Sequence, residues 1–144
     1  MRHRQLTLVE VEFVAHRIAR KLLQWDEPIP DFSSRYPHVL ESCIAAPFQT
    51  YAQKDLYPEL LDKAATLFYF LIKNHPFANG NKRIAMVTTL YFLLQQKKWL
   101  RVDPDELYNF AKWVAASNPK VRAQTIAAIK YFMAVHLVSG VSRK

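Results

Sequence analysis

The chain has 144 residues, of which 51% are apolar and 13% aromatic, and it carries a formal net charge of +8. That length suits one ordinary domain, and this composition excludes an intrinsically disordered chain. The two glycines, Gly80 and Gly140, are too few for the tight turns of a β-sandwich or barrel and favour long helices joined by short connections.

Helical spacing begins close to the N-terminus. Thr7 and Glu10 form the pattern of a capping box, and apolar residues then recur every third or fourth position as far as Leu22. Pro37, at a first-turn position, predicts a short second helix that Pro47 ends. Residues 47–57 follow neither the helical nor the strand period, so we predict an extended connection or a small hairpin there.

The middle of the chain predicts two core helices. The first begins at Pro58 and is apolar nearly all round until Pro76 ends it. The second runs from near Gly80 to about Lys97, and its middle carries no charge. A buried position between neighbouring elements is expected for both helices.

Two further helices are predicted after the core pair. Asp103-Pro104 and Asn118-Pro119 each combine a capping residue with proline at the first helical position. Gly140 lies where a glycine commonly ends a helix. The whole pattern predicts an all-α protein with a single domain over residues 1–144.

A dense polar cluster, residues 74–83, separates the two core helices. Lys82 and Arg83 fall in the first turn of the second core helix, where the helix dipole favours acidic residues. Two cations there repel one another unless an anion lies among them, and the first-turn N–H groups point at the same place. With Gly80 allowing close approach and Arg83 as a forked clamp, the pattern predicts a phosphate cradle.

His75 lies just before this cradle, and histidine suits a general base at neutral pH. These residue types favour phosphoryl or nucleotidyl transfer to a protein hydroxyl. Each residue also has a simpler interpretation. Asn79-Gly80 is an ordinary turn dipeptide, Asn79 is a candidate helix cap, and His75 is a candidate partner for the helix end before it.

The nine residues of this loop resemble the signature of the Fic/Doc family, which reads His-Pro-Phe-x-Asp/Glu-Gly-Asn-Gly-Arg. In this chain the run is His75-Pro76-Phe77-Ala78-Asn79-Gly80-Asn81-Lys82-Arg83. Lysine in place of the second glycine is typical of the Doc (death-on-curing toxin) branch, and Asp55-Leu56-Tyr57-Pro58 is similar to that branch too. The resemblance covers about residues 5–137. It implies a helical bundle of the Fic/Doc type with a flap over about 47–56 and a signature loop at 75–83.

The resemblance also implies a role for each site residue. His75 would take the proton from a serine, threonine or tyrosine hydroxyl of a target protein. The nucleotide phosphates would be bound by Gly80, Asn81, Lys82 and Arg83. Thr50 and Tyr51 would belong to the flap, which holds a target segment through backbone hydrogen bonds, as an added strand does.

Two positions depart from the general Fic pattern. Lys82 resembles the Doc branch, which transfers a phosphoryl group from ATP, rather than the Fic enzymes that transfer AMP. Asn79 stands where the family has the acidic residue that holds Mg²⁺, and a neutral amide oxygen is a weaker ligand for this ion. ATP and Mg²⁺ are thus the implied cofactors, with Asn79 as the metal candidate.

The leading hypothesis is a Doc-like toxin of a toxin–antitoxin pair that phosphorylates a hydroxyl of a cytoplasmic protein, a translation factor by family precedent. The alternatives are an AMP transferase and, because of Asn79, a weakened or non-catalytic binding module. The self-inhibitory Ser/Thr-x-x-x-Glu-Gly/Asn pattern does not occur, so an external antitoxin is expected. The basic residues are too spread out to predict nucleic-acid binding.

The lone Cys43 fits a reducing compartment, and neither a signal peptide nor a membrane-spanning stretch is evident. We therefore expect a cytoplasmic protein without a membrane partner.

Overall fold

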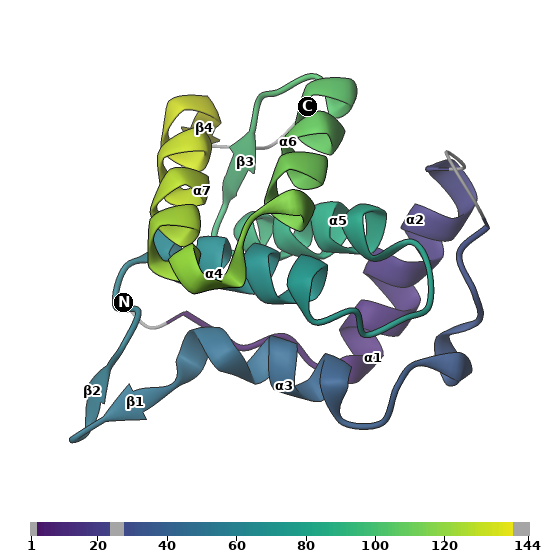
Figure 1. The fold of residues 1–144 in the computed structure, drawn as a ribbon, viewed down its shortest axis with the longest axis horizontal. Coiled ribbons are helices and arrows are strands. Elements are labelled where there is room, and N and C mark those ends of the chain that lie inside the picture. The colour runs from purple at the N-terminus through teal and green to yellow at the C-terminus, as the bar shows by residue number, and fades with distance from the viewer. Residues whose placement is uncertain (1–2, 24–27, 140–144) are drawn as a thin grey trace.

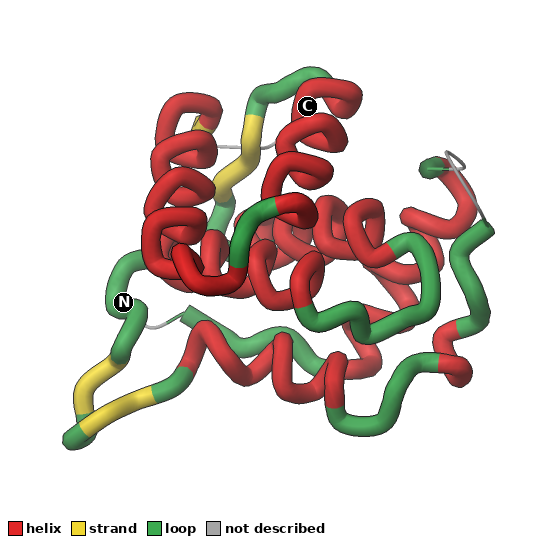
Figure 2. Tube along the Cα trace, viewed as in Figure 1, coloured by secondary structure: helices red, strands yellow, loops and turns green. Residues whose placement is uncertain are grey.

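In the computed structural model, which describes residues 3–23 and 28–139, helices make up most of the chain (Figures 1 and 2). The helices are α1 (Leu8–Glu10), α2 (Arg17–Leu22), α3 (Val39–Ala45), α4 (Leu60–Lys73), α5 (Asn81–Leu94), α6 (Pro104–Ala116) and α7 (Arg122–His136). A π-helical segment joins α1 to α2, and short 3₁₀ turns occur at Phe32–Ser34, Ala46–Phe48 and Pro119–Val121. The prediction of an all-α fold is confirmed.

Strands are few and short in the described part of the chain. β1 (Thr50–Tyr51) pairs with β2 (Lys54–Asp55) as an antiparallel hairpin inside the predicted flap segment. β3 (Lys98–Leu100) pairs with β4 (Leu137–Ser139), also antiparallel, and ties the chain after α5 to the end of α7. The hairpin projects from the body of the molecule at the lower left of Figure 1.

Helices α4 and α5 form the centre of the core. α4 packs against α5, α6 and α7, and α5 packs in turn against the π-helical segment and α6. Their most deeply buried large side chains are Phe68, Leu71, Ile72, Ile84, Phe92 and Leu93. Because the signature loop joins these two helices, both of its ends are held by the core.

The capping box predicted at the N-terminus is present. The Thr7 hydroxyl accepts a hydrogen bond from the Glu10 backbone N–H, and the Glu10 carboxylate accepts one from the Thr7 backbone N–H. The following residues, Val11–His16, are π-helical rather than α-helical.

Several details of the predicted helices are wrong. α4 begins at Leu60 rather than at Pro58, and α7 begins at Arg122, after a 3₁₀ turn, rather than at Pro119. Pro37 lies outside the second helix, because His38 adopts a left-handed conformation (φ 69°) and the helix begins only at Val39. Gly80, not Asn79, occupies the N-cap of α5. α5 ends at Leu94 rather than near Lys97, because Lys97 has a positive φ and the chain then enters β3.

Cys43 is fully buried on α3 and donates a hydrogen bond to the Phe70 carbonyl at 3.3 Å. Burial raises the pKa of its thiol to about 12, so the side chain stays neutral. The expectation that Gly140 ends the last helix is wrong, because α7 ends at His136 and β4 follows it; Gly140 itself lies outside the described residues. Within the described ranges, every helix is too short or too polar to cross a lipid bilayer.

Candidate functional site

The signature loop leaves α4 at Asn74 and turns sharply at His75. His75 has a positive φ of 52°, and its side chain is exposed. The Pro76 carbonyl accepts a hydrogen bond from the Tyr36 backbone N–H at 2.9 Å, which ties the loop to the segment before α3. A non-glycine residue is rarely left-handed, so the fold holds His75 in a conformation that it would not adopt by preference.

Phe77 anchors the loop in the core. Its ring is completely buried and lies 5.2 Å from the His16 ring and 5.9 Å from the Phe32 ring, measured between centroids. His16 is itself buried and contacts the Pro30 carbonyl through Nε2 at 2.9 Å. Burial lowers the pKa of His16, against the opposing effect of the hydrogen bond to Pro30.

Asn81 closes the loop with its side chain. Its Oδ1 accepts from the Phe77 backbone N–H at 3.0 Å, and its Nδ2 donates to the Phe77 carbonyl at 2.7 Å. These two bonds fix the orientation of the amide, so Nδ2 faces His75 Nδ1 at 3.4 Å. Asn81 therefore orients both the loop backbone and the histidine ring.

Gly80 lies where no other residue fits. Its φ is +80°, and a Cβ built on it would lie 2.5 Å from Ile29 Cγ1. The need for glycine therefore has a cause inside the protein, namely the approach of Ile29, as well as the close approach of a phosphate that the sequence predicts.

Arg83 and Lys82 occupy the first turn of α5, as predicted, but their surroundings differ. Arg83 is 3% exposed, and its Nη1 donates to the Leu23 carbonyl at 2.9 Å. Leu23 is the C-cap of α2, a helix end that favours a cation. Arg83 thus joins the end of α2 to the start of α5, and Lys82, which is half-buried, is the more accessible of the two cations.

Asn79 is exposed in the loop immediately before α5. Among the described residues, no three His, Cys, Asp or Glu side chains come together in an arrangement that could hold a metal ion. Asn79 would supply a single neutral oxygen, and Mg²⁺ prefers several oxygen ligands including carboxylates. The residues that the structure describes therefore do not form a Mg²⁺ site of their own.

The structure does not bring the flap and the signature loop together. Thr50 and Tyr51 form β1 of the exposed hairpin, which precedes α4, whereas His75 follows α4. A helix of 14 residues separates the two ends by roughly 20 Å. Figure 1 shows the hairpin and the loop between α4 and α5 on opposite sides of the molecule.

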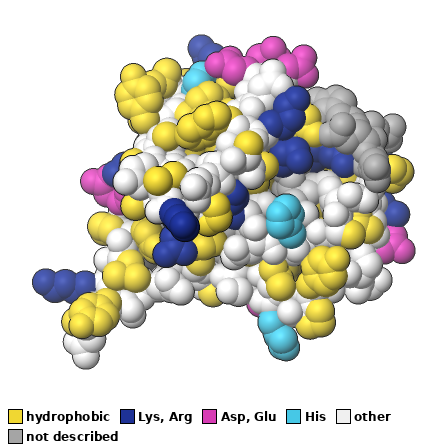
Figure 3. Space-filling view, viewed as in Figure 1, with side chains coloured by type: hydrophobic (Ala, Val, Ile, Leu, Met, Phe, Trp, Pro, Cys, Tyr) yellow, Lys and Arg dark blue, Asp and Glu magenta, His cyan; other side chains and the backbone are white. Residues whose placement is uncertain are grey.

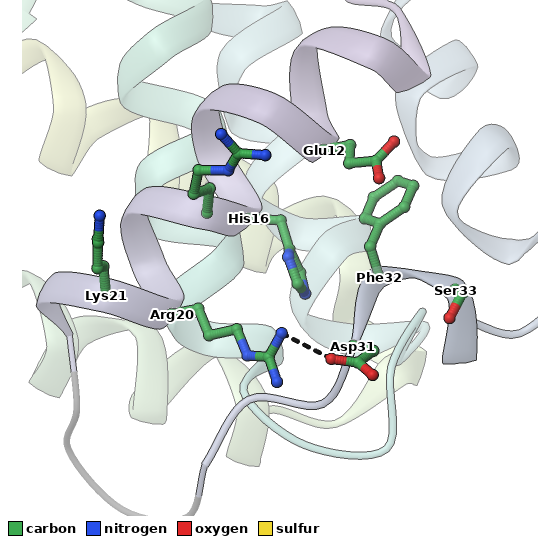
Figure 4. Close-up of a pocket in the computed structure, with 8 residues that line it drawn as sticks. Glu12, His16, Arg20, Lys21, Asp31, Phe32 and Ser33 are labelled. Atoms are coloured by element: carbon green, nitrogen blue, oxygen red, sulfur yellow. Dashed lines mark ion pairs between the residues drawn. The ribbon is translucent and has the colours of Figure 1, made fainter.

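His16 also lines a cavity of about 650 Å³ (Figure 4). It lies between the helical segment from Glu12 to Lys21 and residues 31–33, and Arg20 and Asp31 form an ion pair of 2.7 Å across it. Its wall thus carries charges of both signs. The contact between His16 and Phe77 connects this wall to the signature loop.

Comparison with known proteins identifies the family. The model of the Fic/DOC family matches residues 6–93, which include the π-helical segment, the hairpin, α4, the signature loop and most of α5. The chain belongs to the Fic/Doc family.

One relative of this Fic/Doc protein is Toxin Doc of Mycolicibacterium smegmatis, which is 42% identical over 55 residues. The match covers 38% of this chain and 42% of that toxin, so it spans less than half of either protein. No solved structure matches.

Two buried residues that hold the Fic/Doc site in place were not predicted from the sequence. His16 appears in the sequence only as one residue of an amphipathic helix, and Ile29 as part of a proline-rich connection. Their contacts with Phe77 and Gly80 join positions more than 50 residues apart. The signal available in the sequence was the position of His16 directly after the apolar residues Phe13, Val14 and Ala15, which is too weak to indicate such a contact.

Proposed function

We propose that this Fic/Doc protein is a Doc-like toxin that transfers the γ-phosphoryl group of ATP to a hydroxyl of a cytoplasmic target protein. The main support is His75, an exposed histidine held in a left-handed turn at the start of the loop that leads into α5. A translation factor is the target by family precedent. An antitoxin would be the second partner, since the relative with a matching segment is named as a toxin.

His75 would act as the general base. Transfer forms a bond from the hydroxyl oxygen to the γ-phosphorus and breaks the bond between that phosphorus and ADP, while an imidazole nitrogen of His75 receives the hydroxyl proton. In the present arrangement Asn81 Nδ2 faces His75 Nδ1 at 3.4 Å, a long and weak hydrogen bond. The ring can therefore give up this contact at little cost when substrate binds.

The phosphates would lie at the N-terminus of α5. Gly80 has no side chain that could cap the first-turn N–H groups, and helix N-termini attract anions. Lys82 adds a cation there. Arg83 would contribute mainly through its fixed charge, because its guanidinium donates to the Leu23 carbonyl.

Transfer of AMP is the alternative reaction, and label position separates the two. The purified protein is incubated with a bacterial lysate and with ATP labelled at either the γ- or the α-phosphate. Label from γ alone in a protein band means phosphorylation, and label from α means AMP transfer. A His75→Ala variant must abolish the label, and absence of label from both forms of ATP would leave a non-catalytic binding module.

The residue at position 79 gives a sharper test of the metal requirement. We expect Asn79→Asp to increase labelling and to lower the Mg²⁺ concentration at half-maximal rate several-fold, because a carboxylate is the better ligand. Asn79→Ser, which also offers a neutral oxygen, is the matched control. Equal Mg²⁺ dependence of all three proteins would show that position 79 does not contribute to metal binding.

A further inference from the structure

Lys63 is a buried lysine that the signature motif does not include. It lies in the first turn of α4 and is 2% exposed, although lysine is almost never fully buried without a partner. Removing an ammonium group from water is unfavourable unless charges and hydrogen bonds compensate for it. Its partners therefore indicate what this lysine does.

The partners of Lys63 among the described residues lie at the two ends of the β1–β2 hairpin. The Lys63 ammonium forms an ion pair with Asp55 Oδ2 at 3.3 Å and donates a hydrogen bond to the Tyr57 carbonyl, both at the end that leads into α4. It also lies 5.5 Å from the centre of the Phe48 ring, at the end that enters β1. Phe48 in turn packs edge-on against Phe92 of α5 at 6.0 Å.

The hairpin beyond these ends has little support of its own. Residues 49–56 are all exposed, and β1 and β2 pair over only two residues each. The Leu56 N–H donates to the Gln49 carbonyl at 3.0 Å and closes the base of the hairpin. A hollow of about 750 Å³ lies beside the hairpin. It is lined by Thr50 and Gln53 from the hairpin and by His3 and Lys63 from the rest of the protein.

We propose that Lys63 is a positioning residue that fixes both ends of the β1–β2 hairpin to α4 and so sets the direction of this arm. An isolated two-stranded hairpin is marginally stable in water, so its order must come from such an anchor. Figure 3 shows the arm standing clear of the body with hydrophobic and basic side chains on it. The anchoring is independent of catalysis, whereas its effect on target binding rests on the proposed function.

The matched comparison is with Lys130, the other lysine that reaches this end of α4. Lys130 pairs with Glu59 at 2.9 Å and with Asp62 at 2.8 Å, and its side chain is 38% exposed. It joins α7 to the start of α4. Lys130→Met therefore removes an ion-pair network from the same helix end but leaves the contacts of Lys63 in place.

Hydrogen exchange of the full chain tests the anchor directly. We expect Lys63→Met, which keeps the length of the side chain, to speed amide exchange in residues 49–57 by about tenfold or more, since hydrogen bonds to a charged group are lost. Exchange in α5 should stay unchanged. Lys130→Met should leave residues 49–57 as in the unaltered protein.

A second variant protects the test against misfolding. The Asp55 side chain is half-exposed, so Asp55→Asn removes the ion pair without changing the core. It should speed exchange in the hairpin less than Lys63→Met, because the Tyr57 contact remains, and it should add nothing in the double variant. Additive effects, or unchanged exchange in a folded Lys63→Met protein, would overturn the proposal.

If the protein labels a target, kinetic measurements distinguish the anchoring role of Lys63 from the proposed transferase function. Lys63→Met should raise KM for the target protein several-fold while leaving kcat and the KM for ATP near their original values. If no target is labelled, the exchange measurement still decides whether Lys63 anchors the hairpin. A fall in kcat with unchanged KM would contradict a positioning role.

Discussion

Gly80 carries two separate constraints at a single residue. Its φ of +80° is unfavourable for any residue with a Cβ, and such a Cβ would meet the Ile29 side chain at 2.5 Å. The effect of a substitution here therefore does not depend on whether a phosphate binds. Stability measured without a nucleotide therefore reports only the effects of the backbone conformation and of the contact with Ile29.

We expect Gly80→Ala to lower the free energy of unfolding by about 1–3 kcal/mol, from the positive φ and the contact with Ile29 together. Urea denaturation monitored by circular dichroism measures it. Ala78→Gly, an exposed change in the same loop, is the control and should cost less. An unchanged urea midpoint for Gly80→Ala would mean that Ile29 moves away freely.

Arg83 and Lys82 are neighbours, but we expect Arg83 to stabilise the fold and Lys82 to bind nucleotide. We expect Arg83→Met to reduce the free energy of unfolding by about 1–3 kcal/mol, because it leaves the Leu23 carbonyl without its buried donor. Lys82→Met should change stability by less than about 0.5 kcal/mol yet weaken the stabilisation that added ATP gives. Thermal denaturation with and without ATP measures both. The assignment fails if Lys82→Met is the more destabilising variant.

At the scale of an element, the N-terminal helix depends on one carboxylate. Glu10 completes the capping box with Thr7 and forms an ion pair with Arg4 at 2.7 Å. The hydrogen bond from Arg4 is the main cause that lowers the pKa of Glu10 from 4.5 to about 2. Because the folded pKa is the lower one, this carboxylate stabilises the fold above pH 4.5, and the contribution is lost as the pH falls toward 2.

Glu10→Ala should therefore cost about 1 kcal/mol or more of unfolding free energy at pH 7, and the difference should shrink steadily below pH 4.5. Urea midpoints measured from pH 7 to pH 3 follow it. Glu12→Ala, two residues after Glu10 and outside the capping box, serves as the control. A difference that grows on acidification would show that the pKa of Glu10 is raised instead.

The direction of the β1–β2 hairpin depends on a neighbouring element, helix α4. Local sequence predicts that residues 47–57 leave the helical pattern, and the structure has the β1–β2 hairpin there. The direction of the hairpin depends on Lys63, a residue of the following helix. Its separation from His75 depends on the length of α4. A target bound at Thr50 and Tyr51 would therefore contact the protein far from the modified hydroxyl.

At the scale of the whole molecule, His16 connects three parts of the chain. Its ring contacts Phe77 of the signature loop and Phe32, and its Nε2 contacts the Pro30 carbonyl. Burial lowers its pKa, so the unfolded chain takes up a proton more readily than the folded one. Folding stability should therefore decrease as the pH falls below about 6.5, the usual value for histidine.

We expect His16→Gln to reduce the loss of stability between pH 7.5 and pH 5.5, because glutamine does not titrate but can still donate to the Pro30 carbonyl. Urea midpoints at the two pH values measure the change. His38→Asn, at an exposed residue, is the control. The same pH dependence in His16→Gln and in the unaltered protein would assign the loss to other groups.

The sequence by itself determined the helices, the nine-residue signature and, through them, the family. These features are local: a helical period, a capping residue or a proline acts within a few neighbouring positions. Even so, local signals placed the start of α5 one residue early, since both Asn79 and Gly80 can occupy an N-cap.

Only the tertiary structure decided how the site residues are used. Arg83 finds its partner 60 residues away at Leu23, Gly80 is constrained by Ile29, and Lys63 is buried among the ends of a hairpin. From the sequence, the two cations Lys82 and Arg83 predict a bound anion. The sequence does not show that the C-terminus of α2, with its carbonyl acceptor, faces the start of α5. Contacts between distant segments depend on the packing of the whole chain. The Leu23 carbonyl at the C-terminus of α2 therefore accepts a hydrogen bond from Arg83, which no local pattern predicts.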